Sequence, residues 1–297
     1  MKALVTGCAG FIGSYLVDKL LEQGYEVIGI DCFTDYYPRE IKEANISNAL
    51  KNSKFKLIEE DILEMDEYPE VDYVFHLAAQ AGVRASWGKS FEIYTRNNIE
   101  ATQKLLEFYK GIKIKKFVYA SSSSVYGDVE LPMREDSLLK PVSPYGVTKL
   151  AADFAEIFHG LWTQTAKGMA VHKFVKAIFN GNEITVFGDG TQTRDFTFVD
   201  DAVEANILAA KNNLVGDVFN IGGGSRVSVN DLIEMMEDIT GKKAKVKYIE
   251  KQKGDVRDTL ADVSKAEEEF GWIPKVKIEE GLRKFVNWWE MERLSQY

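Results

Sequence analysis

The feature that most constrains the fold is a short apolar run that passes directly into three closely spaced glycines. Residues 3–6 predict a buried strand, and the glycine loop at 7–13 follows it at the start of a helical pattern over 11–23. Glycines at this spacing permit a tight turn and a close approach of the backbone to a diphosphate, and the helix N-terminus adds free N–H groups. The next apolar run ends in Asp31, an acid placed to take both hydroxyls of an adenosine ribose and to repel a 2′-phosphate. Together these features predict NAD binding.

Strand and helix patterns alternate over the first 160 residues. The expected strands cover 3–6, 27–31, 56–59, 71–77 and 116–121, and the expected helices 11–23, 36–51, 91–109 and 143–158. This alternation predicts an α/β fold with a doubly wound parallel sheet, the Rossmann arrangement. Beyond residue 160 the rhythm changes. We therefore expect an NAD-binding domain over 1–165, rejoined by 200–222, and a smaller C-terminal α/β substrate-binding lobe over 166–199 and 223–297.

Charge and composition exclude several classes of partner. Lys plus Arg total 37 and Asp plus Glu total 46, which gives a net charge of −9. An acidic surface is a poor match for nucleic acid or anionic lipid. Apolar runs stay well short of the roughly 18 residues of a membrane span. Cys8 and Cys32 have no metal-ligand spacing and are interpreted as small packing residues, so no metal is expected. A cytoplasmic enzyme or binding protein remains.

Tyr145 and Lys149 are the first candidates for catalysis. They lie at i and i+4 of a predicted helix, so both side chains share one face. A tyrosine acting as a base near pH 7 needs its pKa lowered by about three units, or ~4 kcal/mol, and a nearby ammonium and an oxidised nicotinamide both stabilise the phenolate. A serine-rich strand end at 121–124 precedes this helix and offers a hydroxyl that can bridge the phenol and a substrate oxygen.

Several motifs now identify a family. They are GlyCysAlaGlyPheIleGly at 7–13, HisLeuAlaAla at 76–79, SerSerSerValTyrGly at 122–127, SerProTyrGlyValThrLys at 143–149 and GlyAspGlyThrGlnThrArgAspPhe at 188–196. In this order they resemble the extended short-chain dehydrogenase/reductase family of nucleotide-sugar enzymes. The resemblance implies a Rossmann domain that holds NAD, a lobe that holds a nucleoside-diphosphate sugar, and a helix-paired homodimer.

The resemblance also assigns residues. It makes Ser122, Tyr145 and Lys149 catalytic. His76 is interpreted as a packed strand-end residue, and Asn98 as a support for its helix and the active site. Asp61 and Ile62, which close the third strand, are plausible contacts on the adenine side. The full set of expected cofactor-binding residues is Gly7, Gly10, Phe11, Ile12, Gly13, Asp31, Asp61, Ile62, Leu77, Ala78, Ala79, Asn98, Tyr145 and Lys149.

Two serines narrow the reaction. Sugar 4,6-dehydratases of the family place an Asp-Glu pair at the positions of Ser123 and Ser124, and the similar glucuronate decarboxylases carry Glu at the second. Without these acids, hydride transfer and one proton shuttle remain, which is the chemistry of an NAD-dependent 4-epimerase, an isomerase. Residues 31–37 and 81–87 resemble UDP-glucuronate 4-epimerases, and Arg84 and Ser86 are expected to help the two serines bind a carboxylate.

Alternatives stay open at this point. A UDP-glucose or UDP-N-acetylglucosamine 4-epimerase uses the same machinery, and a catalytically silent NAD- or nucleotide-sugar-binding protein retains the same motifs. In the second lobe, Phe187 is expected to stack on the uracil of a UDP-sugar, and Arg194 and Arg257 to contact its diphosphate or ribose.

One segment departs from the family pattern. Between Lys149 and Met169 the family has a helix, a buried strand and a loop, whereas residues 150–168 are too few for all three. We expect the central strand and its loop to be missing here, which would leave the backbone of neighbouring strands unpaired. Either the chain is shortened, or further residues belong between Lys149 and Met169; the second is the expectation.

Overall fold

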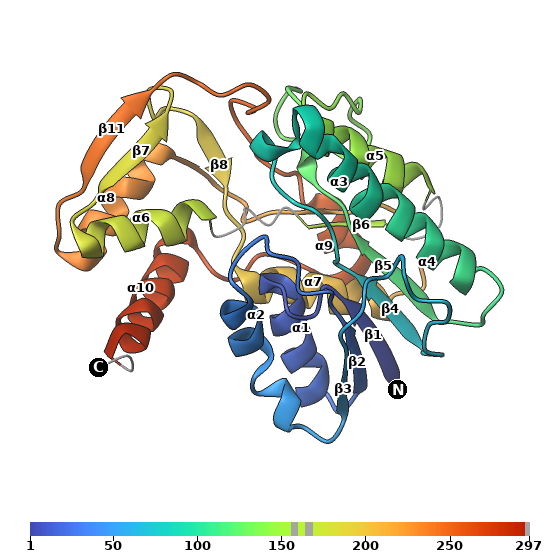
Figure 1. Ribbon diagram of the computed structural model, residues 1–297. Coiled ribbons are helices and arrows are strands. Elements are labelled where there is room, and N and C mark those ends of the chain that lie inside the picture. Colours follow the sequence, from blue (N-terminus) through green and yellow to red (C-terminus); the bar gives the residue numbers. More distant parts are fainter. Residues whose placement is uncertain (156–159, 164–168, 295–297) are drawn as a thin grey trace.

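The computed structural model describes residues 1–155, 160–163 and 169–294, and it consists of a central parallel sheet covered by helices with a smaller group of strands and helices beside it (Figure 1). The central sheet has seven strands in the order β3-β2-β1-β4-β5-β6-β9, and all neighbouring pairs are parallel. Its strands are β1 (Lys2–Thr6), β2 (Glu26–Ile30), β3 (Phe55–Ile58), β4 (Tyr73–His76), β5 (Lys116–Ala120), β6 (Gly160–Thr163) and β9 (Asn220–Ile221). The predicted α/β class with a doubly wound parallel sheet is confirmed.

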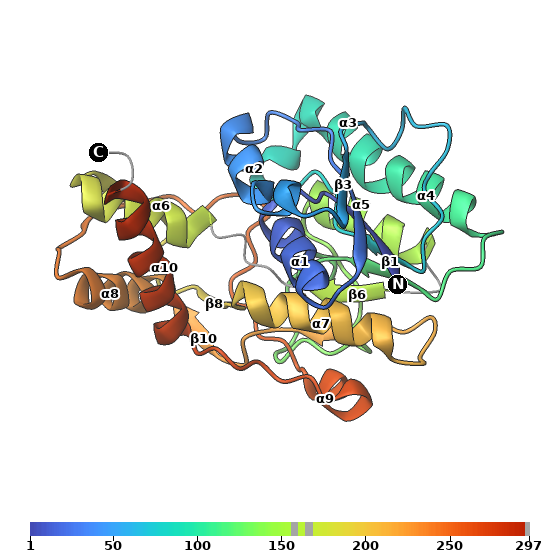
Figure 2. The ribbon, with the colours of Figure 1, turned by 90° about the horizontal axis from the view of Figure 1, so that it is seen from below.

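Helices cover both faces of this sheet (Figures 1 and 2). Leu4 and Val5 show why, because these adjacent residues of β1 are fully buried and belong to two different apolar layers. Val5 packs with Leu16 of α1, and Leu4 packs with Leu105 of α4. The helices around the sheet are α1 (Phe11–Glu22), α2 (Arg39–Ile46), α3 (Phe91–Tyr94), α4 (Ala101–Tyr109), α5 (Pro144–Ala155), α7 (Val199–Lys211) and α9 (Ser264–Phe270).

The smaller group has its own core. It pairs β7 (Glu183–Phe187) with β11 (Lys245–Ile249) in parallel and β8 (Thr193–Asp195) with β10 (Arg226–Ser228) in antiparallel. Its helices α6 (Met169–Asn180), α8 (Val229–Thr240) and α10 (Ile278–Leu294) bury an apolar cluster against β7. None of the described helices has the length and apolar character that crossing a membrane requires.

Two expected helices are interrupted. The pattern over 36–51 forms α2 and a separate 3₁₀ turn, Ala49–Lys51. The pattern over 91–109 forms α3 and α4, with the π-helical segment Thr95–Glu100 between them. A π segment inserts an extra residue into the helical turn, which hydrophobic periodicity does not reveal, and such segments often occur at functional sites.

The expectation that the central strand is missing was wrong. Residues Gly160–Thr163 form β6, which pairs with β5 through Tyr119↔Gly160 and with β9 through Trp162↔Asn220. Four residues suffice because the first two residues of β6 pair with β5 and the last two pair with β9. The loop expected after this strand falls on 164–168, outside the described residues. Whether further residues belong between 150 and 169 stays a prediction, which an intact mass compared with 33.5 kDa measures.

Candidate functional site

The glycine loop lies between the carboxyl ends of β1 and β4, where the order of the strands reverses. In open α/β sheets this reversal opens a crevice that binds ligands. Gly7 has a φ of +69°, and a Cβ there would come within 2.9 Å of the backbone nitrogen of Ala78. At Gly13 a Cβ would collide with the carbonyl of Gly7. No side chain caps the start of α1, so its first N–H groups stay available for a diphosphate. The loop therefore fits a dinucleotide.

Asp31 follows β2 and is 8% exposed. Its Oδ2 accepts a hydrogen bond from the backbone nitrogen of Ala9 at 3.1 Å, and its Oδ1 accepts from that of Phe33 at 2.8 Å. Phe33 has a φ of 48°, in the left-handed region where non-glycine residues are uncommon, so this turn is specifically shaped around the acid. The carboxylate is thus fixed beside the glycine loop.

The loop after β4 lies against the glycine loop. The backbone nitrogen of Ala78 donates to Thr6 Oγ1 at 3.2 Å. His76 is fully buried between the hydroxyls of Thr6 and Thr102, at 2.7 and 3.0 Å, and burial lowers its pKa to about 3. A neutral imidazole bonded on both nitrogens matches the interpretation of His76 as a packing residue.

Asn98, in the π-helical segment, joins this loop to α5. Its Oδ1 accepts from the Gln80 nitrogen at 2.7 Å, and its Nδ2 donates to the Gln80 oxygen and to Thr148 Oγ1, both at 3.0 Å. These bonds agree with a supporting role. On the expected adenine side, Ile62 is 6% exposed and Asp61 Oδ2 accepts from Arg96 Nη1 at 2.7 Å.

The residues expected to be catalytic gather at the end of β5 and the start of α5. Burial raises the pKa of Tyr145 to about 12, and a side-chain hydrogen bond with Ser122 acts in the opposite direction. Lys149 is 1% exposed, and its Nζ donates to the Ala120 carbonyl at 2.7 Å. A phenol with this pKa is protonated at neutral pH, so added positive charge has to stabilise its phenolate before it can act as a base.

Ser86 and the serine run surround these residues. Ser86 is fully buried, donates to the Val83 carbonyl at 2.7 Å and accepts from the Tyr145 backbone nitrogen at 3.1 Å. Both functions of its hydroxyl are therefore used within the protein, which argues against the expected substrate contact. Ser123 and Ser124 are half-buried.

Arg84 bridges to the smaller group of strands. Its Nη2 lies 2.6 Å from Asp255 Oδ2, and its guanidinium carbon lies 3.9 Å from the centroid of the Phe187 ring. We call residues 250–257, which follow β11, the strap. Lys253 of the strap also lies over the ring of Trp87, 4.4 Å from its centroid. Arg84 is thus paired with the strap and with one face of Phe187. Its expected contact with a uronate stays a prediction.

The other two expected arginines differ in exposure. Arg194 donates from Nη1 to the carbonyl of Arg257 at 2.8 Å and from Nη2 to that of Val256 at 2.9 Å, and burial lowers its pKa. These two bonds attach Arg194 to the strap. The Arg257 side chain is 73% exposed, and its Nε lies 3.6 Å from Asp258.

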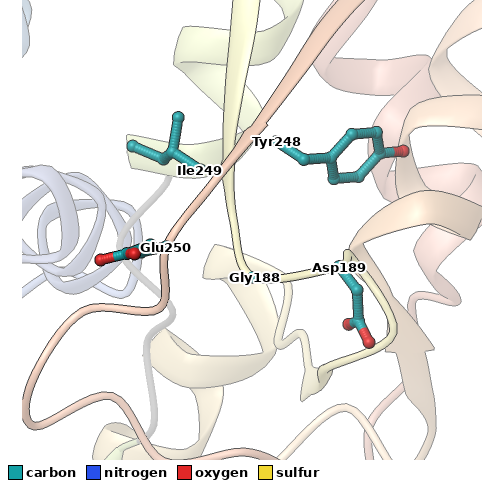
Figure 3. Close-up of a pocket in the computed structure, with 5 residues that line it drawn as sticks. All are labelled: Gly188, Asp189, Tyr248, Ile249 and Glu250. Carbon is teal, nitrogen blue, oxygen red and sulfur yellow. The ribbon is translucent and has the colours of Figure 1, made fainter.

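A shallow hollow of about 630 Å³ lies beside Phe187, at the ends of β7 and β11. Its lining residues come from these two strand ends, and Tyr248 and Asp189 project to one side of the strands while Ile249 and Glu250 project to the other (Figure 3). The hollow contains none of the expected catalytic residues. It offers an aromatic side and an acidic rim next to the residue expected to stack on uracil.

Across the described ranges, no group of three or more His, Cys, Asp or Glu side chains is placed to hold a metal ion. Cys8 is buried and Cys32 is exposed, and neither forms a disulfide.

Sequence reasoning missed three residues near the site. Asp255 lies 171 residues from its partner Arg84, a pairing that no local pattern reveals. Asp153 follows Lys149 by one helical turn and accepts from Ser121 Oγ at 2.8 Å, so its i+4 spacing was a usable signal. Lys42 is the third. It lies in the charged sequence of α2, which does not indicate that this one lysine is buried.

Comparison with known proteins gives consistent matches over nearly the whole chain. The family model described as GDP-mannose 4,6 dehydratase matches residues 4–159 and 163–285, and its break falls at β6. A UDP-glucuronate 4-epimerase of Thermodesulfobacterium geofontis is 39% identical over 308 positions, covering 96% of this chain and 95% of that protein. A Bacillus subtilis protein described as an uncharacterized UDP-glucose epimerase is 39% identical over 302 positions, covering 95% and 96%. Both alignments exceed 297 positions, so these relatives carry residues that this chain lacks.

A solved structure agrees. The UDP-glucuronic acid 4-epimerase of Bacillus cereus, in complex with UDP-glucuronic acid and NAD, superimposes with a TM-score of 0.95 at 41% identity, covering 98% of this chain and all of that one. The chain therefore belongs to the GDP-mannose 4,6 dehydratase family, within the extended short-chain dehydrogenases/reductases that act on nucleotide sugars.

Proposed function

We propose that this protein is an NAD-dependent UDP-sugar 4-epimerase that acts on UDP-glucuronate. The observation that carries the proposal is the group formed by Tyr145, Ser122 and Lys149 beside a glycine loop that fits a dinucleotide. The two relatives and the solved structure described above bear epimerase names and support the same reaction.

In this reaction Tyr145 takes the proton of the sugar 4-hydroxyl, and Ser122 bridges the phenol and the substrate oxygen. NAD⁺, held by the glycine loop and Asp31, would supply the hydride acceptor for C4 and the hydride that reaches the opposite face of the sugar. Because the pKa of Tyr145 is about 12 with Lys149 in place, the positive charge of a bound oxidised nicotinamide would have to add to that of Lys149 in stabilising the phenolate during proton transfer. The raised pKa thereby couples the base to occupancy of the cofactor site.

Ser123 and Ser124 support glucuronate as the sugar. Oxidation at C4 places a ketone β to the C6 carboxylate, an arrangement that loses CO₂ when the carboxylate aligns with the π system. Hydroxyl donors hold a carboxylate in a fixed orientation and supply no acid–base group to promote this loss. A neutral CH₂OH would leave such donors under-used, at a cost of roughly 1–3 kcal/mol for each unsatisfied buried group.

The experiment is NMR of UDP-glucuronate, UDP-glucose and UDP-N-acetylglucosamine, each incubated separately with the enzyme. Faster epimerisation of UDP-glucuronate with little CO₂ supports the proposal. Faster conversion of a neutral sugar would assign the alternative UDP-glucose or UDP-N-acetylglucosamine 4-epimerase, and a pentose product would indicate a decarboxylase. If no UDP-sugar turns over while NAD⁺ binds, the protein is a silent binding protein.

The proposal includes a homodimer that works in the cytoplasm. Exposed apolar side chains support pairing through the face that carries α3 and α5, since Ile93, Val147 and Phe154 are 50%, 46% and 63% exposed there. It also retains the division into an NAD-binding domain and a nucleotide-sugar-binding lobe, except that α9, which packs against β9, is assigned to the NAD-binding domain and not to the lobe. Ser86 and Asn98 are proposed as supports of Tyr145 and its helix, with Arg194 at the substrate diphosphate.

A further inference from the structure

Lys42 is buried where a lysine is seldom found. Lysine side chains are almost never fully buried unless they are paired, and Lys42 is only 5% exposed. It lies on α2, a charged helix of which only Lys42 and Ile46 are buried. Something other than hydrophobic burial therefore holds this side chain inside.

Its ammonium is directed at the acid expected to bind ribose. Lys42 Nζ lies 3.3 Å from Asp31 Oδ1 and 3.4 Å from Thr34 Oγ1. Both members of the ion pair have side chains only 7% exposed. Asp31 Oδ2 accepts from the glycine loop and Oδ1 faces the ammonium of Lys42, so both carboxylate oxygens are held by the protein.

From this geometry we propose that Lys42 is a specificity-determining residue of the cofactor site, and that the pair Asp31–Lys42, rather than Asp31 alone, selects NAD over NADP. The inference rests on the proposed NAD-dependent function. With both residues present, a 2′-phosphate would meet the Asp31 carboxylate and be repelled. Without that carboxylate, the buried ammonium would lack its partner and would bind the phosphate as a charge-assisted donor.

Arg39 is the natural rival for this role. It lies on the same helix, and its guanidinium stacks over the Phe33 ring at 4.6 Å from the centroid. However, it is bound by Glu43 at 2.7 Å and by Glu59 at 2.8 Å, and its side chain is 49% exposed. Its charge is therefore compensated by two acids that remain when Asp31 is removed. Lys42 is therefore the cation that loses its ion-pair partner when Asp31 is replaced.

The test is calorimetric titration of NAD⁺ and NADP⁺ into the wild type, Asp31→Asn, Lys42→Met and the double variant. Wild type is expected to prefer NAD⁺, and Asp31→Asn to shift the ratio of the two affinities toward NADP⁺ by about 100-fold or more, equivalent to about 2.7 kcal/mol. The double variant is expected to lose that gain, whereas Asp31→Asn combined with Arg39→Met keeps it. An unchanged ratio in Asp31→Asn, or a gain that persists in the double variant, would overturn the proposal.

Lys42→Met alone provides a second test of the proposal if Asp31→Asn does not fold. It is expected to weaken NAD⁺ binding about tenfold or more while UDP binds as in wild type, because the damage is confined to the ribose end of the cofactor site. Unchanged NAD⁺ affinity, or an equal loss of UDP affinity, would contradict the inference. Failure of wild type to bind NAD⁺ at all would instead reject the proposed function, so the two failures can be told apart.

Discussion

At the scale of single residues, the site depends on what burial does to ionisable groups. Tyr145 and Asp153 lie two helical turns apart, and desolvation raises the pKa of each, to about 12 and about 6. Burial penalises the charged form in both cases, so the phenol is held protonated and the carboxyl resists ionisation. For Tyr145 the consequence concerns activity, and for Asp153 it concerns the stability of the fold.

Tyr145→Phe is expected to remove nearly all turnover while UDP-sugar and NAD⁺ binding persist. The change deletes the proton shuttle but retains the ring, which packs edge-on against Tyr94 at 6.2 Å between centroids. The measurement is kcat for UDP-glucuronate, with UDP affinity as the control for folding. Retention of more than about a tenth of wild-type kcat, a barrier increase below about 1.4 kcal/mol, would show that Tyr145 is not the base.

Asp153→Asn is expected to stabilise the fold at neutral pH. Because the folded-state pKa of Asp153 is raised from 3.8 to about 6, the folded protein binds this proton more tightly than the unfolded chain does. Ionisation therefore costs stability as pH rises through this window. The amide oxygen can still accept from Ser121, whereas Asp153 Oδ1 has no hydrogen-bond partner now.

Urea unfolding of wild type and Asp153→Asn between pH 4 and pH 8 measures this effect. The difference in unfolding free energy should be small at pH 4 and should grow until about pH 6. The exposed Asp66→Asn serves as the control and should show no such growth. A difference independent of pH would mean that the Asp153 carboxyl is not the titrating group.

At the scale of elements, the local sequence pattern predicted features that lie within one strand, loop or helix. It did not predict contacts between elements that are distant in sequence. The glycine loop and the Tyr145–Lys149 spacing were readable because each lies within about one turn of chain. β6 was not, because its partners β5 and β9 are distant in sequence and four residues carry both pairings. The strap was missed for the same reason.

The strap leads to a prediction about Arg84. Asp255→Asn is expected to raise KM for UDP-glucuronate and UDP-glucose by a similar factor of about fivefold, because the half-exposed ion pair with Arg84 contributes only about 1 kcal/mol to closing the strap. Steady-state kinetics with both sugars make the measurement, and Lys251→Gln, at an exposed position of the strap, is the comparison variant.

A selective loss would have a different meaning. If Arg84→Gln weakened the binding of UDP-glucuronate far more than that of UDP-glucose, Arg84 would bind the C6 carboxylate as the sequence suggested. The ion pair between Asp255 and Arg84 would then exist only until substrate binds. Equal losses for both sugars would assign Arg84 to the strap.

At the scale of the whole molecule, the two faces of the central sheet differ in what they leave exposed. α1 and α7 pack together on one face, whereas α4 and α5 lie on the other (Figures 1 and 2). On the second face, Phe154 of α5 is 63% exposed and lies two turns from Val147. Residues two turns apart on a helix lie on the same side, so the pair forms an apolar stripe. This stripe is exposed to water unless a second copy covers it.

Phe154→Glu and Val147→Glu are therefore expected to convert a homodimer into monomers. Each places a charge in the proposed interface, where burying it without a partner costs more than the apolar contact contributes. Light scattering coupled to gel filtration measures the mass, against a monomer of 33.5 kDa. The matched control is Val215→Glu, an equally exposed apolar residue (62%) in the loop after α7, which should stay dimeric. A monomeric wild type, or variants that remain dimeric, would show that the face carrying α3 and α5 is not where two copies meet.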